Sequence, residues 1–353
     1  MKKLFLSLVA AIVAATATYA QSSMLATLSH EGNISTFYGS TALRDAYNAS
    51  THGDIITLSS GSFTPVNIEK ALTIRGAGML VDTVAKTYPT IITGSFSINI
   101  PDSIEQRLTM EGLYNNFTVT IGGTLKNASF LKDRFYAIDV TSSTRINNLT
   151  LIHSRITGFF NLPSESSASC VNCYVNNAYC RSNTSSNYEF TNCVIWNTGA
   201  YVSNGNGGSG YHYLSGISSS SFTNCIIYAS SGNSTYDILS SSNSAFYCIG
   251  KSTYTGAAIF GNIPNSTNTI VSGGLSTIFK TFTGTYNDNE TFELTEDAKT
   301  KYKGGDGTEV GIYGGSLPFD PTPTNPQITK CNVASKSTAD GKLSVDIEVS
   351  AAE

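Results

Sequence analysis

Four basic side chains recur at matching intervals in the middle of the chain. Lys132 and His153 are 21 residues apart, and so are Arg134 and Arg155. If the chain folds into coils of about that length, stacking would bring all four side chains together. Such a cluster could bind a carboxylated or sulfated glycan. In a β-elimination, Arg155 or Arg134 could neutralise a uronate carboxylate while Lys132 or His153 removes the adjacent proton.

The same residues could instead form a solvated surface whose charge is balanced by neighbouring carboxylates. Asp133 and Asp139 are close to them in the sequence, and exposed ion pairs contribute little to stability. Between residues 121 and 260 the chain holds seven Lys and Arg but only five Asp and Glu, so this stretch is locally basic. The carboxylates are scattered, and we expect no calcium site, no other metal and no cofactor.

A second candidate binding surface is an insertion rich in Tyr, Gly, Asn and Ser. It adds about ten residues to an ordinary coil, within residues 198–216. Tyrosine rings can stack on sugar faces while their hydroxyls bond to sugar oxygens. Alternatively, the aromatic rings pack back onto the scaffold. The candidate binding residues in this insertion and just before it are Trp196, Tyr201, Tyr211, His212 and Tyr213.

These candidates need a scaffold, and the spacing of asparagines predicts one. Asn127, Asn148, Asn172, Asn192 and Asn224 each precede a small or apolar residue, at intervals of 21, 24, 20 and 32. A repeat of that length indicates one coil of a solenoid. When these asparagines are aligned, apolar residues at positions minus two, plus one and plus three should face inward, so the chain must bend at the asparagine. Asparagine tolerates the left-handed conformation of such a bend, and its amide could bond to the next one in a ladder.

Residues 1–20 have the features of a signal peptide. Lys2 and Lys3 precede an apolar stretch over residues 4–15, which is too short to span a bilayer. No later apolar run suits a membrane helix, so we expect a secreted or surface protein without a transmembrane segment in the mature chain. Without Lys2 and Lys3, 19 basic and 25 acidic residues leave a formal charge near −6. That balance argues against nucleic acid as a partner.

Seven cysteines, an odd number, do not suggest a disulfide framework. Cys173, Cys193, Cys225 and Cys248 are predicted at inward positions of successive coils, where a thiol behaves as a small hydrophobe. Stacking would nevertheless place Cys173 and Cys193 within disulfide reach, and export permits oxidation. The sequence leaves both states of these cysteines open.

Two parts of the chain resemble a known family. Residues 46–61 contain Gly-Asp-Ile-Ile-Thr-Leu, and Gly-Ser-Phe at 61–63 and Leu-Thr-Ile-Arg-Gly at 72–76 follow. They look like the opening of pectate-lyase-like right-handed parallel β-helix proteins. Residues 292–295 and 306–315 are similar to the closing segment of β-helix proteins exported by Bacteroidetes-type bacteria. The resemblance therefore points to the periplasm or outer cell surface of a Gram-negative bacterium.

The resemblance implies an all-β fold with a single-stranded right-handed parallel β-helix over residues 21–319. Residues 41–49 have the spacing of a short amphipathic helix that would cap the first coil. Residues 320–326, Asp-Pro-Thr-Pro-Thr-Asn-Pro, predict a stiff extended linker. Residues 327–353 predict a short β-hairpin-like tail with Asp340-Gly341 as its turn.

The resembled family includes lyases and glycoside hydrolases that act on acidic polysaccharides, and members without known activity. The hydrolase segments Asn-Thr-Asp, Asp-Asp, Gly-His-Gly and Arg-Ile-Lys do not occur in this sequence. We therefore expect a β-helix protein that binds a polysaccharide or surface glycan without catalysis. The alternatives are a metal-independent polysaccharide lyase acting on a uronate-containing glycan, and a structural spacer or adhesin.

Overall fold

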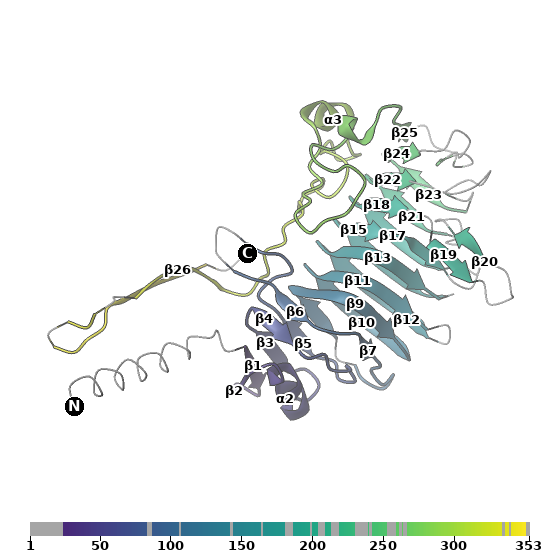
Figure 1. The fold of residues 1–353 in the computed structure, drawn as a ribbon. Helices are drawn as coiled ribbons and strands as arrows, with labels where there is room; N and C mark the ends of the chain where they lie inside the picture. The colour runs from purple at the N-terminus through teal and green to yellow at the C-terminus, as the bar shows by residue number, and fades with distance from the viewer. Residues whose placement is uncertain are drawn as a thin grey trace, which may run out of the picture.

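The protein forms a right-handed parallel β-helix, as the sequence predicts (Figure 1). The structure is a computed structural model. It describes residues 24–82, 87–105, 107–141, 144–163, 165–180, 186–197, 200–203, 209–212, 219–229, 239, 242–252, 259–260, 263, 267–333, 336–338 and 340–350.

Two long sheets form the walls of the β-helix. The first contains, in spatial order, β2 (Asn33–Tyr38), β1 (Leu25–His30), β3 (Ile55–Leu58), β5 (Thr73–Arg75), β8 (Thr109–Glu111), β10 (Thr124–Leu131), β12 (Arg145–Ile152), β14 (Ser167–Val171), β17 (Asn187–Thr191), β21 (Ser221–Thr223) and β23 (Ser244–Phe246). The second contains β4 (Gly61–Phe63), β6 (Thr90–Ile92), β9 (Leu113–Ile121), β11 (Arg134–Val140), β13 (Arg155–Leu162), β15 (Tyr174–Asn176), β18 (Val194–Asn197), β22 (Ile226–Ala229), β24 (Ile249–Ser252) and β25 (Thr269–Ile270), while β7 (Phe96–Ile98) pairs with β9 and β16 (Ala178–Cys180) with β13. Pairing is parallel except at the N-terminal edge, where β1 is antiparallel to both β2 and β3.

The interior is filled by apolar side chains that stack from coil to coil. One column runs through Phe130, Leu151, Cys170, Phe190 and Phe222, which are paired in register across β10, β12, β14, β17 and β21. All five are buried. The rings of Phe190 and Phe222 stack with their centroids 5.2 Å apart. Parallel strands in register place like side chains above one another, so each coil buries its neighbour's apolar face.

The bend between the two sheets is a column of residues in the left-handed conformation, which we call the corner column. Its members have φ values between 50° and 69°. They are Gly112, Lys132, His153, Asn172, Asn192, Asn224 and Tyr247. Glycine and asparagine suit this backbone geometry, whereas lysine, histidine and tyrosine adopt it less readily.

The coil alignment predicted from the asparagines is wrong in its first two repeats. Asn127 and Asn148 are also left-handed, but they form kinks inside β10 and β12. Lys132 and His153 hold the corner positions of those coils, so the step from His153 to Asn172 is 19 residues instead of 24. The coils of Asn127 and Asn148 each have two left-handed positions, the kink and the corner, and the 24-residue interval concealed a change from one to the other. The predicted ladder does exist at the kink, where Asn148 Nδ2 donates to Asn127 Oδ1 at 3.1 Å.

The residue that follows each corner points into the interior. From coil to coil this inner column contains Asp133, Ser154, Cys173, Cys193, Cys225 and Cys248. The four cysteines are buried and their thiols are free, so no disulfide joins them. Burial raises the pKa of the Cys193 and Cys248 thiols.

We expect these four thiols to resist alkylation in the folded protein. The reagent must reach the sulfur atom, and all four side chains are at most 1% exposed. Iodoacetamide at pH 8, followed by peptide mass spectrometry, should leave all four unmodified before denaturation and modified after it. Labelling of Cys193 or Cys225 in the folded protein would contradict the stacked column.

After β25 the chain turns back and covers the outer face of the second sheet. We call residues 271–302 the covering segment. It contains η2 (Leu275–Thr277) and α3 (Glu296–Lys301). Phe292 stacks on Tyr174 with ring centroids 4.6 Å apart, and Phe282 meets Trp196 edge-on at 4.7 Å. A second hydrophobic core thus lies outside the β-helix.

Residues 303–325 then run along the corner column toward the N-terminal coils (Figure 1). We call this segment the C-terminal strap. Near its start the Gly305 N–H donates to Asn224 Oδ1 at 2.9 Å. Further on, Asn172 Nδ2 donates to the carbonyls of Ile312 and Gly314, both at 2.8 Å. The asparagines of the corner column therefore hold the C-terminal strap in addition to forming the bend.

The proline-rich stretch predicted as a linker is the end of this strap and lies on the N-terminal coils. The Thr324 N–H and hydroxyl bond to the Glu111 carboxylate at 2.6 and 2.8 Å. Asn325 Nδ2 donates to the Gly76 carbonyl at 2.9 Å. The strap thus connects coils that are far apart along the axis of the β-helix.

Both ends of the described chain carry the elements that the sequence predicts. The helix α2 (Ala42–Ala49) buries Leu43 and Ala46 at the N-terminal end of the stack. β26 (Gln327–Val333) and β27 (Val345–Ser350) form an antiparallel hairpin, which extends away from the coils in Figure 1. The predicted signal peptide lies outside the described residues. None of the helices in the described part of the chain has both the length and the apolar character that crossing a membrane requires.

Candidate functional site

The structure brings the four predicted basic residues together. Arg134 and Arg155 pair directly across β11 and β13. Lys132 and His153 sit next to them in the corner column, with φ values of 54° and 51°. These left-handed residues supply the turn that directs the arginines to the outer face of the second sheet.

The C-terminal strap covers two of these four residues. Lys132 Nζ bonds to Asp320 Oδ2 at 3.3 Å and to the Thr322 carbonyl, and its side chain is only 13% exposed. His153 Nε2 bonds to the Leu317 carbonyl at 3.1 Å, and the imidazole is buried against Phe319. Burial lowers the pKa of His153, so the ring is neutral at pH 7. Both residues therefore serve as attachment points for the strap.

Arg134 is also held by partners within the protein. Its Nε donates to Asp288 Oδ1 at 3.1 Å and its Nη1 to Asn116 Oδ1 at 2.7 Å. The guanidinium lies 4.5 Å from the centre of the Tyr114 ring. These contacts anchor the covering segment at Asp288.

Arg155 has a donor nitrogen without a hydrogen-bond partner, and the buried Nδ1 of His153 is likewise unpaired. The residue is 3% exposed, and its Nη1 donates to the Asp288 carbonyl at 3.2 Å. Its guanidinium lies 5.1 Å from the Phe319 ring centre and 5.6 Å from that of Phe292. Its Nε is buried without a hydrogen-bond partner. A buried charged donor left unpaired is costly, which indicates that an acceptor belongs at this position.

Arg155 lies at the edge of a cavity of about 500 Å³ between the second sheet and the covering segment. The lining residues are Met79, Leu80, Val81, Pro89, Tyr114, Arg155, Asp288, Asn289, Glu290, Thr291, Tyr313, Phe319 and Pro321. Among these described residues, Arg155 alone has a buried side-chain nitrogen or oxygen without a partner. Burial raises the pKa of Tyr114 and Tyr313, so both hydroxyls stay protonated.

The carboxylates of this cavity already have partners. Asp288 accepts from the hydroxyls of Tyr114 at 3.1 Å and Tyr286 at 3.0 Å. Glu290 Oε1 accepts from the Thr281 hydroxyl at 2.7 Å. The carboxylates beside Arg155 are therefore satisfied within the protein, and Arg155 is the cation that lines the cavity.

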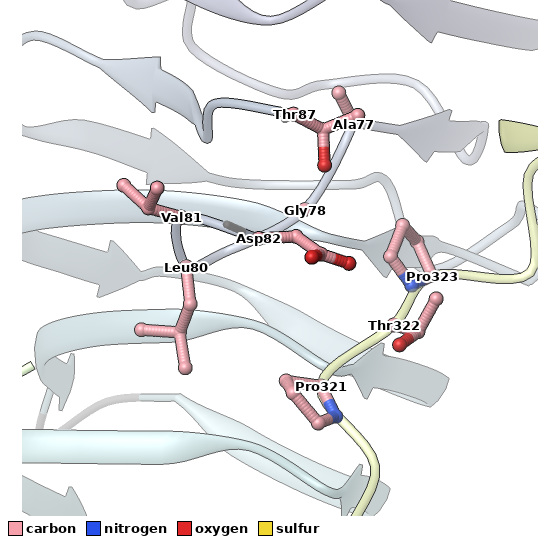
Figure 2. Close-up of a pocket in the computed structure, with 9 residues that line it drawn as sticks. All are labelled: Ala77, Gly78, Leu80, Val81, Asp82, Thr87, Pro321, Thr322 and Pro323. Carbon is pink, nitrogen blue, oxygen red and sulfur yellow. The ribbon is translucent and has the colours of Figure 1, made fainter. Parts of the chain in front are cut away.

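A smaller hollow of about 210 Å³ adjoins this cavity and shares Leu80, Val81 and Pro321 with it. Figure 2 shows its two sides, with the loop of residues 77–82 facing Pro321, Thr322 and Pro323 of the strap. The two hollows offer room for more than one sugar unit along the strap.

The predicted tyrosine-rich surface is not part of this cavity. Trp196 is buried, and its ring stacks on Tyr228 with centroids 3.8 Å apart, so it belongs to the outer core. Tyr201 lies in β19 (Ala200–Ser203), opposite Tyr211 in the antiparallel β20 (Ser209–His212), and His212 lies opposite Ala200. Tyr213 lies outside the described residues. A sugar-binding role for this hairpin stays a prediction.

The sequence interpretation missed most residues of the cavity. Tyr114 belongs to the second sheet, whereas Tyr313 and Phe319 belong to the strap about 200 residues later, and they meet only because the strap folds back. The resemblance of residues 306–315 to a closing segment was a usable signal that this region packs on the coils. Nothing in the sequence indicated which coils it would meet.

We compared the chain with known proteins. No family model matches it, and no match is found among curated proteins or among solved structures.

Proposed function

We propose that the protein binds a polysaccharide or surface glycan in the cavity beside Arg155, without catalysis, outside the cell. The observation that carries this proposal is the unpaired Nε of Arg155, a buried cation between aromatic rings. Guanidinium groups bond well to carboxylate, sulfate and hydroxyl oxygens. Tyr114, Tyr313 and Phe319 add ring faces and hydroxyls suited to a sugar.

Binding fits the geometry better than β-elimination does. A catalytic base must reach the substrate proton within about 3 Å, directly or through one water. The two candidate bases, Lys132 and His153, are instead bonded to the strap. A lyase would therefore need the strap to detach.

Filling the cavity should weaken binding. Thr291 is exposed at the cavity wall, so Thr291→Trp would occupy the space with little effect on either core. Isothermal titration with soluble polygalacturonate and alginate fragments should show measurable affinity for the wild type. For Thr291→Trp we expect the affinity to fall at least about tenfold, which corresponds to about 1.4 kcal/mol.

Thr300→Trp is the matched control, because Thr300 is exposed on α3 and does not line the cavity. It should bind like the wild type. Equal binding by Thr291→Trp would refute the cavity as the site. Steady formation of unsaturated uronides, seen as ultraviolet absorbance, would instead favour the lyase.

A further inference from the structure

An exposed aromatic cluster lies on the second sheet, outside the cavity. Phe117 on β9 is 45% exposed, and Tyr136 on β11 is 43% exposed. Phe159 on β13 is half-buried, and its ring centre lies 6.4 Å from that of Tyr136. We call these three residues the aromatic patch. Large aromatic side chains left in water on neighbouring strands indicate an interaction surface.

The backbone is shaped to hold the patch. Between Phe135 and Ala137 the register of β11 shifts against both neighbouring strands, so Tyr136 alone faces two residues on each of them. Such bulges redirect a side chain. Beneath the ring lies Gly158, where an added Cβ would be 2.8 Å from Tyr136 Cε2. Tyr136 therefore lies across bare backbone and against Phe159, in a fixed position.

The surroundings of the patch are polar but uncharged. The neighbouring side chains Asn116, Thr118 and Thr157 are neutral. The two charged side chains of β11 are engaged elsewhere: Arg134 is buried and bonded to Asp288, and Asp139 accepts a hydrogen bond from Asn161. An acidic ligand would find no free cation among these residues.

We propose that the aromatic patch is a second sugar-binding surface, which takes a chain of neutral pyranose sugars. Stacking of a sugar face needs only one or two ordered rings with polar groups beside them. A stable protein interface needs about 800 Å² from each partner. Phe117 and Tyr136, each less than half exposed, together offer on the order of 200 Å² of surface, which is too little for such an interface. This surface acts independently of the cavity and extends the ligand range to uncharged chains.

Affinity electrophoresis in gels that contain hydroxyethyl cellulose, galactomannan or xylan tests the proposal. At least one of these neutral polysaccharides should retard the wild type. Tyr136→Ala should weaken that retardation about tenfold, as expected for the loss of a stacked ring. Tyr136→Phe should keep it.

Tyr38→Ala is the matched control, because Tyr38 is also largely exposed but lies on β2, away from the patch. Thr291→Trp should leave retardation by the neutral polysaccharides unchanged, which separates this surface from the cavity. The proposal is overturned if none of the three polysaccharides retards the wild type, or if Tyr136→Ala is retarded equally. A lower molar mass of Tyr136→Ala in light scattering would identify the patch as a contact between copies and would also overturn it.

Discussion

Replacing Asn172 by alanine should lower the free energy of unfolding by about 3–5 kcal/mol. Asn172 is 1% exposed and holds the C-terminal strap through two hydrogen bonds of 2.8 Å. Without the amide, the carbonyls of Ile312 and Gly314 lose a partner in a buried position, which costs about 2–4 kcal/mol. Alanine also pays about 1 kcal/mol to adopt the left-handed backbone at φ 50°.

Two further variants separate these contributions. Asn172→Gly tolerates the backbone conformation but lacks the amide, so we expect about 2–4 kcal/mol of destabilisation. Asn148→Ala changes an exposed left-handed asparagine that contacts Asn127 and should cost about 1 kcal/mol.

Guanidinium-induced unfolding measures the stability of each variant, and limited proteolysis reports whether the strap has opened. Both Asn172 variants should be cleaved faster within residues 303–325 than the wild type is. If Asn172→Ala and Asn148→Ala are destabilised equally and the strap stays protected, the asparagine contributes only to the bend. That result would show that the bonds between Asn172 and the strap do not contribute to stability.

The fold could be predicted because its periodicity is local. Each coil repeats the same sequence of inward apolar residues and left-handed bends, so nearby residues alone indicate the shape. The alignment failed at Lys132 and His153 because the corner tolerates several residue types there. Lys132 and His153 each bond to the strap, and these bonds offset the cost of their unfavourable backbone conformation.

The candidate site could be predicted only in part, because it depends on contacts between distant segments. The stacking of Arg134 and Arg155 follows from their 21-residue spacing. Their burial does not, because it results from Asp288 and Phe319, which lie more than 130 residues further along the chain. The four basic side chains therefore form no exposed surface: Arg134, His153 and Arg155 are buried, and the strap covers most of Lys132. Arg155 alone of the four lines the cavity.

Asp133→Asn should stabilise the protein at neutral and alkaline pH. Asp133 is completely buried in the inner column, where later coils carry serine or cysteine. Oδ1 accepts from the Leu113 N–H at 2.8 Å, and Oδ2 has no partner. Burial, reinforced by the nearby Glu111 carboxylate, raises the pKa of Asp133 well above its usual value of 3.8.

The sign of the pH dependence follows from proton linkage. Above about pH 4 the unfolded chain loses the proton of Asp133 while the folded chain keeps it, so stability falls as pH rises toward the folded pKa. An asparagine amide has nearly the same shape and does not titrate. Wild type and Asp133→Asn should therefore be similar in stability at pH 4, and the variant should become increasingly more stable than the wild type as the pH rises to 8.

Denaturant unfolding of both proteins from pH 4 to pH 8 isolates this effect, because all other groups titrate equally in the pair. Asp102→Asn is the matched control: its carboxylate is 67% exposed and paired with Lys126, so its removal should change stability by at most about 1 kcal/mol. A stability difference between Asp133→Asn and wild type that stays constant with pH would show that Asp133 does not titrate on unfolding. A difference of the opposite sign at pH 8 would mean that the folded protein stabilises the ionised carboxylate, and a cation would then have to be sought beside Oδ2.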